Sequence, residues 1–398
     1  MSITATEHTT IRDQVLDRIR ELRPLFEANA ARTEADRRVV EENITALRAA
    51  DAFRIMLPKR FGGLETDIRT KLEVSREVAM GCGSTAWVTA LMNVCAFFVS
   101  LGNEQLQHDV WGSDPDARIS GVFNPTATTK RVDGGYIVNG AWNWTSGCLH
   151  SDWAFLGVPL VNEAGEFVMP AMALMPYAEL EIEDTWFTTG MRGTASNTVH
   201  ARDVFVPDHR LMSVPGLLTH DYDTPFKDEV LYRSAFIPVA ALILVGPLLG
   251  LAQAALDYVI EKGHKRGIAY TEYEVQRDAP TFQLAIAKAA TLVDTAHLFA
   301  YRAAGDIDDA ARADRAMTYV ERARVRMDTG HAAETAREAI RVLCSAHGAS
   351  SFAESSPMQR WWRDAEIASR HAVVSPEISA QVYGRALMGF TDGVTFLV

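Results

Sequence analysis

The chain is poor in cysteine, and its few cysteines form no recognisable site. Cys82, Cys95, Cys148 and Cys344 are scattered over 398 residues without a Cys-x-x-Cys pair or zinc-ligand spacing. No disulfide framework is therefore expected, which favours a reducing compartment, the cytoplasm. Residues 1–10 are polar and lack the basic and then apolar pattern of a secretory signal peptide, which agrees with that location.

Positive charge and cofactor signatures are also scarce. The chain has 39 Lys and Arg against 51 Asp and Glu, a net charge of −12, and no basic cluster, which argues against nucleic acid as a partner. No Gly-x-Gly-x-x-Gly run follows a predicted strand, so no NAD(P)H site is expected. His331-Ala-Ala-Glu334 is one helical turn without a second pair of matching spacing, so no metal site is expected either.

Only one long hydrophobic run occurs. Ser234–Leu256 contains no charged residue and is long enough to cross a bilayer. Pro238, Gly246, Pro247 and Gly250 interrupt it, and neither a second run nor a strong basic flank accompanies it. A helix buried on all sides of a bundle has the same composition. We therefore expect a buried helix and no membrane association.

The pattern of the chain changes twice. Residues 11–57 carry apolar side chains at helical spacing, and the chain after about residue 226 is helical again. Between about 119 and 206 the apolar runs are short, β-branched or aromatic, and separated by turns such as Asp133-Gly134-Gly135. We predict an α+β protein with an N-terminal helical domain at 1–115, a central β-domain at 116–215 and a C-terminal helical domain at 216–398.

The most unusual segment is Gly140–Trp153, which holds three tryptophans in fourteen residues. In an extended strand, Trp142, Trp144 and Ser146 would share one face. An aromatic wall that carries a hydroxyl suits a flat heteroaromatic ligand. The same pattern is typical of a buried strand end with its tryptophans in the core. The residues alone leave both interpretations open.

A series of motifs, spread over nearly the whole chain, resembles the acyl-CoA dehydrogenase fold. Within that fold they are most similar to the oxygenase components of two-component (group D) flavin-dependent monooxygenases, such as p-hydroxyphenylacetate hydroxylase and the steroid and polyketide aromatic hydroxylases. The motifs are Gly83–Trp87, Trp142–Gly147 with His150–Trp153, Gly190–Thr198, Val204–Asp208, and Trp361–Asp364 with His371. The resemblance implies a helical N-terminal domain, a central β-barrel or β-sandwich and a C-terminal four-helix bundle.

The resemblance also implies a reaction. Such enzymes take reduced flavin from a separate NAD(P)H:flavin reductase, react it with O2 to a C4a-hydroperoxyflavin, and hydroxylate a small aromatic of the phenol, naphthol or indole type. FMN is the expected flavin, with FAD possible, and a homotetramer assembled through the C-terminal bundle is implied. The alternatives are an acyl-CoA dehydrogenase or nitroalkane-type oxidase, an N- or S-oxygenase on the same scaffold, and a flavin- or ligand-binding protein without activity.

The position of the catalytic base distinguishes the two enzyme branches. Acyl-CoA dehydrogenases typically carry a catalytic glutamate shortly after the Arg-Asp pair, and the matching position here is Ala372, with His371 beside it. Alanine cannot remove an α-proton, whereas histidine, with an ordinary pKa near ~6.5, can take or share a phenol proton. The resemblance makes His371 the expected catalytic base, although alone it reads as an exposed helix histidine next to Arg370.

The resemblance implies flavin contacts in two segments of the β-domain and one contact in the bundle. Ser146 matches the hydroxyl that hydrogen-bonds flavin N5, which would make it catalytic, and neighbouring Thr145 is the alternative if the strand register shifts by one. Trp144 would form a wall of the flavin site. Arg192 and Ser196 would contact the ribityl or phosphate, or form only a turn with a salt bridge. Arg266 matches an arginine that contacts the flavin phosphate of a neighbouring subunit.

Substrate contacts are implied at five positions, each of which could instead be structural. Trp87 and Phe123 would be aromatic walls, and Asn93 and Ser120 polar contacts. His150 would form a dyad with Asp152, or an orienting pair of structural importance only. The five implied substrate contacts are therefore Trp87, Asn93, Ser120, Phe123 and His150.

Overall fold

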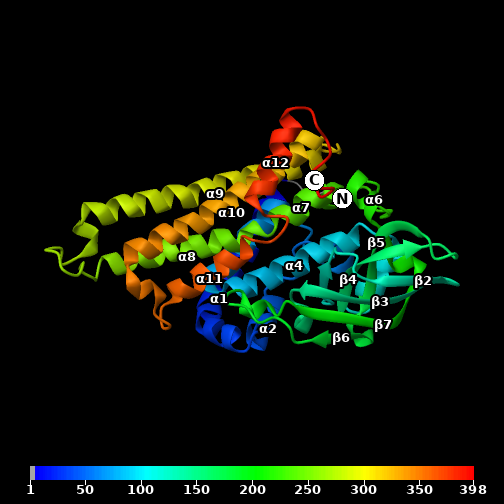
Figure 1. Cartoon of the computed structure of the whole chain (residues 1–398), viewed down its shortest axis with the longest axis horizontal. Helices are drawn as coiled ribbons and strands as arrows, with labels where there is room; N and C mark the ends of the chain where they lie inside the picture. The colour runs from blue at the N-terminus through cyan, green and yellow to red at the C-terminus, as the bar shows by residue number, and fades with distance from the viewer. Residues whose placement is uncertain (1–4) are drawn as a thin grey trace.

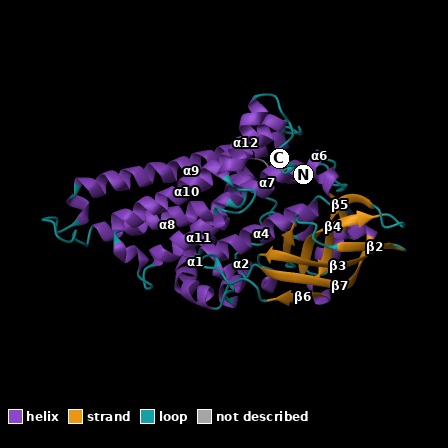
Figure 2. Cartoon of the chain, viewed as in Figure 1, coloured by secondary structure: helices purple, strands orange, loops and turns teal. Residues whose placement is uncertain are grey.

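Helices, then strands, then helices follow one another along the chain, in the expected order (Figure 1, Figure 2). The computed structural model describes residues 5–398, so residues 1–4 of the polar N-terminal segment lie outside the described part. The N-terminal helices are α1 (Ala5–Ala35), α2 (Glu41–Ala49), α3 (Ile68–Gly81), α4 (Gly83–Ser100) and α5 (Glu104–Trp111). Helix α4 is apolar on almost every side and is buried over nearly its whole length, because other elements surround it.

The strands form a sandwich of two four-stranded sheets, in the orders β1-β4-β5-β8 and β2-β3-β7-β6. Their bounds are β1 (Ile119–Val122), β2 (Thr128–Val132), β3 (Gly135–Thr145), β4 (Trp153–Val161), β5 (Phe167–Pro176), β6 (Leu180–Glu183), β7 (Asn197–Pro207) and β8 (Leu211–Ser213). β1 and β4 pair in parallel, and the other pairs are antiparallel. Asp133-Gly134-Gly135 joins β2 to β3 as predicted, with Gly134 at a φ of 72°.

The chain after β8 is helical. Its helices are α6 (Val214–Thr219), α7 (Phe236–Leu242), α8 (Val245–Gly263), α9 (Pro280–Arg312), α10 (Tyr319–His347), α11 (Pro357–Ala368) and α12 (Pro376–Leu387). Helices α8, α9 and α10 run alongside one another with α11 beside them, which is the expected bundle (Figure 1). One apolar core passes through this bundle and the N-terminal helices, and a separate core fills the sandwich. The domain limits at 115/116 and 215/216 stay predictions.

The uncharged run at 234–256 divides into two buried helices. α7 ends at Leu242 and α8 begins at Val245, close to Pro247, whose ring removes the hydrogen bond that a continuous helix would make to Ile243. By length and composition Phe236–Gly263 and α4 could each cross a membrane, yet 89% and 94% of their apolar windows are buried inside the protein. The expected buried helix is confirmed, with a break that the composition did not place.

Helix α8 lies unusually close to α3. A Cβ on Gly250 would come within 2.2 Å of the Arg76 carbonyl oxygen, so only glycine allows this approach. Because α3 also packs on α1, the C-terminal bundle and the N-terminal helices form one continuous structure.

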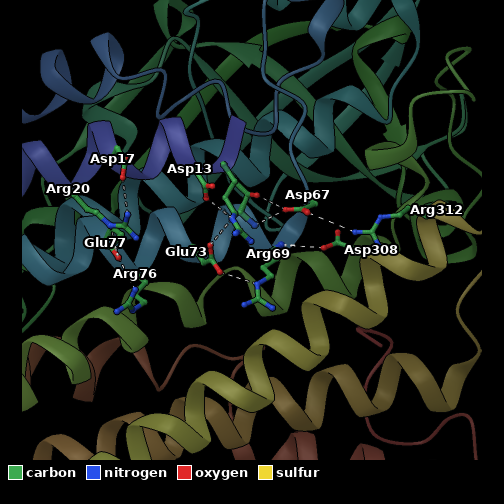
Figure 3. A network of polar contacts seen from close by, with 12 residues as sticks. Asp13, Asp17, Arg20, Asp67, Arg69, Glu73, Arg76, Glu77, Asp308 and Arg312 are labelled. Carbon is green, nitrogen blue, oxygen red and sulfur yellow. Dashed lines mark hydrogen bonds and ion pairs between the residues drawn. The ribbon is translucent and has the colours of Figure 1, made fainter. Parts of the chain in front are cut away.

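Charged side chains reinforce the junction of α1, α3 and α9 (Figure 3). Asp308 on α9 is 6% exposed and accepts hydrogen bonds from the backbone N–H groups of Ile68 (3.0 Å) and Arg69 (3.4 Å), so it caps α3 from another helix. Further along α3, Glu77 is buried and contacts Arg76 at 2.8 Å. Asp308 thus pairs backbone donors that the start of α3 would otherwise leave unsatisfied, while Glu77 lies near the other end of the helix.

Asp308 is expected to make stability depend on pH. Burial, and then the negative charge of Asp67, raises the pKa of Asp308 to about 7, against about 3.9 in an unfolded chain. The folded protein therefore binds the extra proton more tightly, and this contribution to stability is complete below pH 4 and lost as the pH rises through 7. Relative to wild type, Asp308→Asn should gain roughly 4 kcal/mol of unfolding free energy between pH 4 and 8, and the Tm difference between the two proteins should widen accordingly. Asp309→Asn, which removes an exposed carboxylate, is the control, and parallel curves for wild type and Asp308→Asn would contradict the assignment.

Candidate active site

The tryptophan segment leaves β3 through a bulge, not as a regular strand. The register between β3 and β7 shifts between Trp142 and Thr145, and Trp144 has a φ of 65°. Trp142 is fully buried, with its indole Nε1 donating to the Gly157 carbonyl at 2.8 Å, whereas Trp144 is 69% exposed. The expectation that Trp142 and Trp144 share one face is therefore wrong. Trp142 belongs to the sandwich core, and only Trp144 presents its ring to a ligand.

Ser146 lies in a continuous chain of hydrogen bonds that joins three elements. The indole Nε1 of Trp87 on α4 donates to the Ser146 hydroxyl at 3.3 Å. Ser146 and Ser196 are 2.7 Å apart, and so are Ser196 and Thr194. Thr194 in turn donates to the Met191 carbonyl at 2.8 Å. The predicted residues Ser146, Ser196 and Trp87 are thus brought together, and Thr194 is added to them.

Two loops with unusual backbone angles hold this chain in place. Gly147 has a φ of 79°, and Met191 and Ala195 have φ of 51° and 45°, a left-handed region that non-glycine residues rarely adopt. The loops are tied together because the N–H of Gly147 donates to the Thr194 carbonyl at 2.9 Å. Such conformations persist only where the surroundings fix them, and they concentrate at functional sites.

Helix α11 anchors the second loop. The buried Asp364 carboxylate accepts the Met191 N–H at 2.5 Å, and burial raises the pKa of Asp364 to about 6. A Cβ on Gly190 would lie 2.3 Å from the Arg363 carbonyl oxygen, so glycine is required for the contact. The Arg363-Asp364 pair therefore positions the loop that carries Thr194.

His371 lies in the turn after α11, next to the same chain of hydrogen bonds. Its ring centroid is 5.9 Å from that of Trp87. The residue is exposed to solvent, yet enough protein surrounds the ring that desolvation lowers the pKa of His371 to about 4. The imidazole is consequently neutral at neutral pH and able to accept a proton. Ala372 beside it supplies no carboxylate.

These residues fit a flavin. Trp144 offers an exposed aromatic face, and the adjacent Ser146 hydroxyl, 7% exposed, keeps one lone pair that no side chain in the described part of the chain uses. A flat ring system with one polar edge would satisfy both groups. Bound flavin would supply the chemistry of oxygen activation, and the protein groups would bind and orient it.

Three of the predicted flavin contacts have other partners in the structure. Thr145 is fully buried and donates to the Trp142 carbonyl at 3.1 Å, so its hydroxyl cannot replace that of Ser146. Arg192 bonds the carbonyls of Glu34 (3.3 Å) and Thr188 (3.1 Å), which ties its loop to α1. Ser196 bonds Ser146 and Thr194 within the chain of hydrogen bonds.

Arg266 forms a second polar cluster, far from Ser146 in the same chain. It lies in the loop between α8 and α9, at the end of the bundle opposite the sandwich (Figure 1). Its guanidinium contacts His347 Nε2 at 3.0 Å and Ser350 Oγ at 2.8 Å. An open hollow of about 410 Å³ is lined by residues close in sequence to His347 and Ser350, including Gly348 and Ala349.

The predicted substrate contacts divide into aromatic and structural residues. Phe123 packs between Phe98 and Phe236, with ring centroids 5.2 and 5.3 Å away. The buried amide of Asn93 is occupied by three backbone groups, the carbonyls of residues 52 and 89 and the N–H of residue 56. The buried Ser120 hydroxyl bonds Tyr177 Oη at 2.6 Å. Asn93 and Ser120 therefore have protein partners already.

His150 and Asp152 do not form the expected dyad. Asp152 accepts the N–H of Arg118 at 2.9 Å, and His150 Nδ1 lies 3.6 Å from Glu41 of α2. Burial, and then the charge of Arg38, lowers the pKa of His150 to about 4. The two residues occupy a 3-10 turn and its end, not one strand, so they point to different partners.

Several residues of the site carry no distinctive sequence signal. Thr194 and Ser350 are isolated hydroxyls in loops, and Tyr177 follows a strand. Asp364 stood in a recognised motif, but only the fold shows which backbone group it binds. Within residues 5–398, no group of three or more His, Cys, Asp or Glu side chains is placed to hold a metal ion.

Comparison with known proteins agrees with this geometry. The family model for the acyl-CoA dehydrogenase N-terminal domain matches residues 5–111, and that for the C-terminal domain matches residues 242–376. Among curated proteins, the flavin-dependent monooxygenase oxygenase subunit HsaA of Mycobacterium tuberculosis is 34% identical, over 96% of this chain and 97% of its own. The oxygenase component of the FADH(2)-dependent resorcinol hydroxylase of Rhizobium sp. is 30% identical, over 94% of each chain.

A solved structure extends the likeness to three dimensions. XiaF from Streptomyces sp., in complex with FADH2 and glycerol, superposes with a TM-score of 0.93 and is 36% identical, over 98% of each chain. The predicted fold and the predicted resemblance are confirmed. This chain belongs to the oxygenase subunits of the flavin-dependent monooxygenases that have the acyl-CoA dehydrogenase fold.

Proposed function

We propose that this chain uses externally supplied reduced flavin and O2 to hydroxylate a small aromatic substrate. The observation that carries the proposal is the contact of His371 with Trp87, whose indole N–H binds Ser146. A proton acceptor and a hydroxyl for the flavin edge thus lie on two sides of one indole. The relative named as a resorcinol hydroxylase supports an aromatic substrate, since resorcinol is a phenol.

His371 would accept or share the proton of the substrate hydroxyl. A phenol that loses this proton is a far better carbon nucleophile, so a base beside the substrate accelerates attack on an electrophilic oxygen. Because desolvation lowers its pKa to about 4, His371 is neutral at physiological pH, and its free ring nitrogen can share this proton. A phenol, naphthol or indole-type ring suits an aromatic neighbour such as Trp87.

FAD is favoured over FMN as the flavin. Two relatives that are at least 30% identical are described with FADH2, namely XiaF and the resorcinol hydroxylase. The Arg266, His347 and Ser350 cluster offers donors for a phosphate, and the adjacent open hollow leaves room for more of the cofactor than FMN contains.

A homotetramer would place that cluster on a neighbouring subunit's flavin. The loop that carries Arg266 lies at the end of the bundle away from the sandwich, whereas Ser146 follows β3 at the side of the sandwich that faces the helices, so the two groups belong to separate parts of one protomer (Figure 1). Large apolar side chains on the bundle are exposed, including Leu284, Leu298, Leu387 and Met388, which is typical of an assembly surface. Sedimentation at four times the 43.9 kDa chain mass would support this assembly, and a monomer would contradict it.

The subunit also needs a partner that reduces flavin, because no dinucleotide signature follows a strand in the sequence. We expect a separate NAD(P)H:flavin reductase and a cytoplasmic location, where the four cysteines, all free and buried, remain reduced.

The discriminating experiment supplies the protein with chemically reduced FAD, O2 and a panel of phenols, naphthols and indoles. Formation of a hydroxylated product without any reductase protein would support the proposal. Oxidation of an acyl-CoA with a dye acceptor, and no product from the aromatics, would identify a dehydrogenase instead. Ala372 in place of a carboxylate makes that second result unexpected.

A further inference from the structure

The chain of hydrogen bonds through Ser146 has a fixed direction, because the groups at its two ends have fixed roles. At one end, the indole N–H of Trp87 can only donate. At the other end, the Met191 carbonyl can only accept, and it lies 2.8 Å from the Thr194 hydroxyl. A hydroxyl oxygen this close to a carbonyl oxygen must place its proton between them, since two lone pairs would otherwise repel.

Each hydroxyl has only one proton to donate, so fixing the direction of one hydrogen bond fixes the direction of the next. Thr194 gives its proton to Met191 and must accept from Ser196. Ser196 has then used its proton and must accept from Ser146. All three hydroxyls are at most 7% exposed, which leaves little room for water to change the order.

The consequence falls on Ser146. Its proton is committed to Ser196, and one of its two lone pairs accepts from Trp87. Only the second lone pair remains, so Ser146 can accept a hydrogen bond from a ligand but cannot donate one without breaking the chain.

We propose that Thr194 and Ser196 are positioning residues that make Ser146 an obligate acceptor, and that they thereby select reduced over oxidised flavin. The inference rests on the proposed function, in which Ser146 faces flavin N5. Reduced flavin carries a hydrogen on N5 and oxidised flavin carries a lone pair there. An acceptor therefore pairs with the reduced form and opposes the oxidised form, as suits a subunit that receives its flavin already reduced.

The test measures the ratio of dissociation constants for oxidised and reduced FAD, by anaerobic titration. The wild-type protein should bind reduced FAD at least tenfold more tightly. Thr194→Val removes the acceptor for the Ser196 proton, so the chain can reverse and Ser146 can donate to oxidised flavin. We expect the ratio to fall about tenfold, the range of one hydrogen bond. Thr194→Ser keeps the hydroxyl and should keep the wild-type ratio.

A second variant acts at another point of the same chain. Ser196→Ala removes the acceptor of the Ser146 proton and should lower the ratio in the same way, while Ser196→Thr should restore it. A structural role alone would weaken both forms of flavin equally and leave the ratio unchanged, which would overturn the inference. If wild-type protein binds neither form, the proposed function fails and the inference fails with it; binding with an unaltered ratio in both variants refutes the inference alone.

Discussion

Replacement of His371 by alanine is expected to lower the rate of hydroxylation by about 10²- to 10³-fold while the protein still binds reduced flavin. The reason is that the neutral imidazole beside Trp87 can accept the substrate proton, and proton transfer by a placed side chain contributes about this much. Product formation in single turnovers with reduced FAD and a phenol is the measurement. An unchanged product rate would show that another group is the base, or that none is needed.

The pH profile gives an independent check on the same residue. Desolvation holds the pKa of His371 near 4, so the ring is neutral and able to accept a proton at every pH above about 5. The loss of rate on acidification should therefore centre near pH 4, not near the ordinary histidine value of ~6.5. His371→Gln, which keeps a hydrogen-bonding group but does not titrate, should lose this acid limb. A wild-type limb near 6.5 would show that the ring is not desolvated in the working enzyme.

Ser146→Ala is expected to uncouple oxygen consumption from hydroxylation, so that most of the reduced flavin yields hydrogen peroxide. The hydroxyl oxygen is the acceptor that would hold the N5 hydrogen of the flavin, and without it that hydrogen leaves more easily. Flavin binding should weaken only modestly, by about tenfold, the range of one lost hydrogen bond. Peroxide formed per O2 consumed, measured with and without substrate, reports the effect.

The neighbouring hydroxyl provides a matched control. Thr145→Val removes a buried hydroxyl one residue away, whose one bond goes to the Trp142 carbonyl. It should leave the coupling of product to oxygen as in wild type, although it costs some stability. If Thr145→Val uncouples the reaction and Ser146→Ala does not, the two residues have the reverse roles. The bulge at Trp144 would then direct the Thr145 hydroxyl, and not that of Ser146, to the flavin.

The fold was predictable because it depends on local patterns. Apolar spacing of three and four residues marks helices such as α1, and short β-branched runs mark the strands. The uncharged run at 234–256 was correctly predicted to be buried, since prolines and glycines make it unsuitable as a membrane span. Its break near Ile243 follows from Pro247, which is visible in the sequence, but the close approach of α8 to α3, where Gly250 meets the Arg76 carbonyl, is not.

The candidate site was predictable only as a set of residues, not as an arrangement. His371, Ser146, Trp87 and Ser196 were recognised through motifs and do lie together. Asn93 was expected to contact substrate, but its amide bonds backbone groups of residues 52 and 56 and of residue 89 in its own helix. A single amide does not reveal in sequence which partners it will find. His150 and Asp152 were predicted from a strand that is in fact a 3-10 turn.

The sequence by itself determined the order of helices and strands, the absence of a carboxylate at Ala372 and the presence of histidine beside it. The tertiary structure alone decided that Trp142 is core while Trp144 is exposed, because the positive φ at Trp144 reverses the alternation that a strand would impose. It also decided the direction of the hydrogen bonds at Ser146. That direction is set by groups fifty or more residues apart, and only folding brings such groups within the short range over which protons are shared.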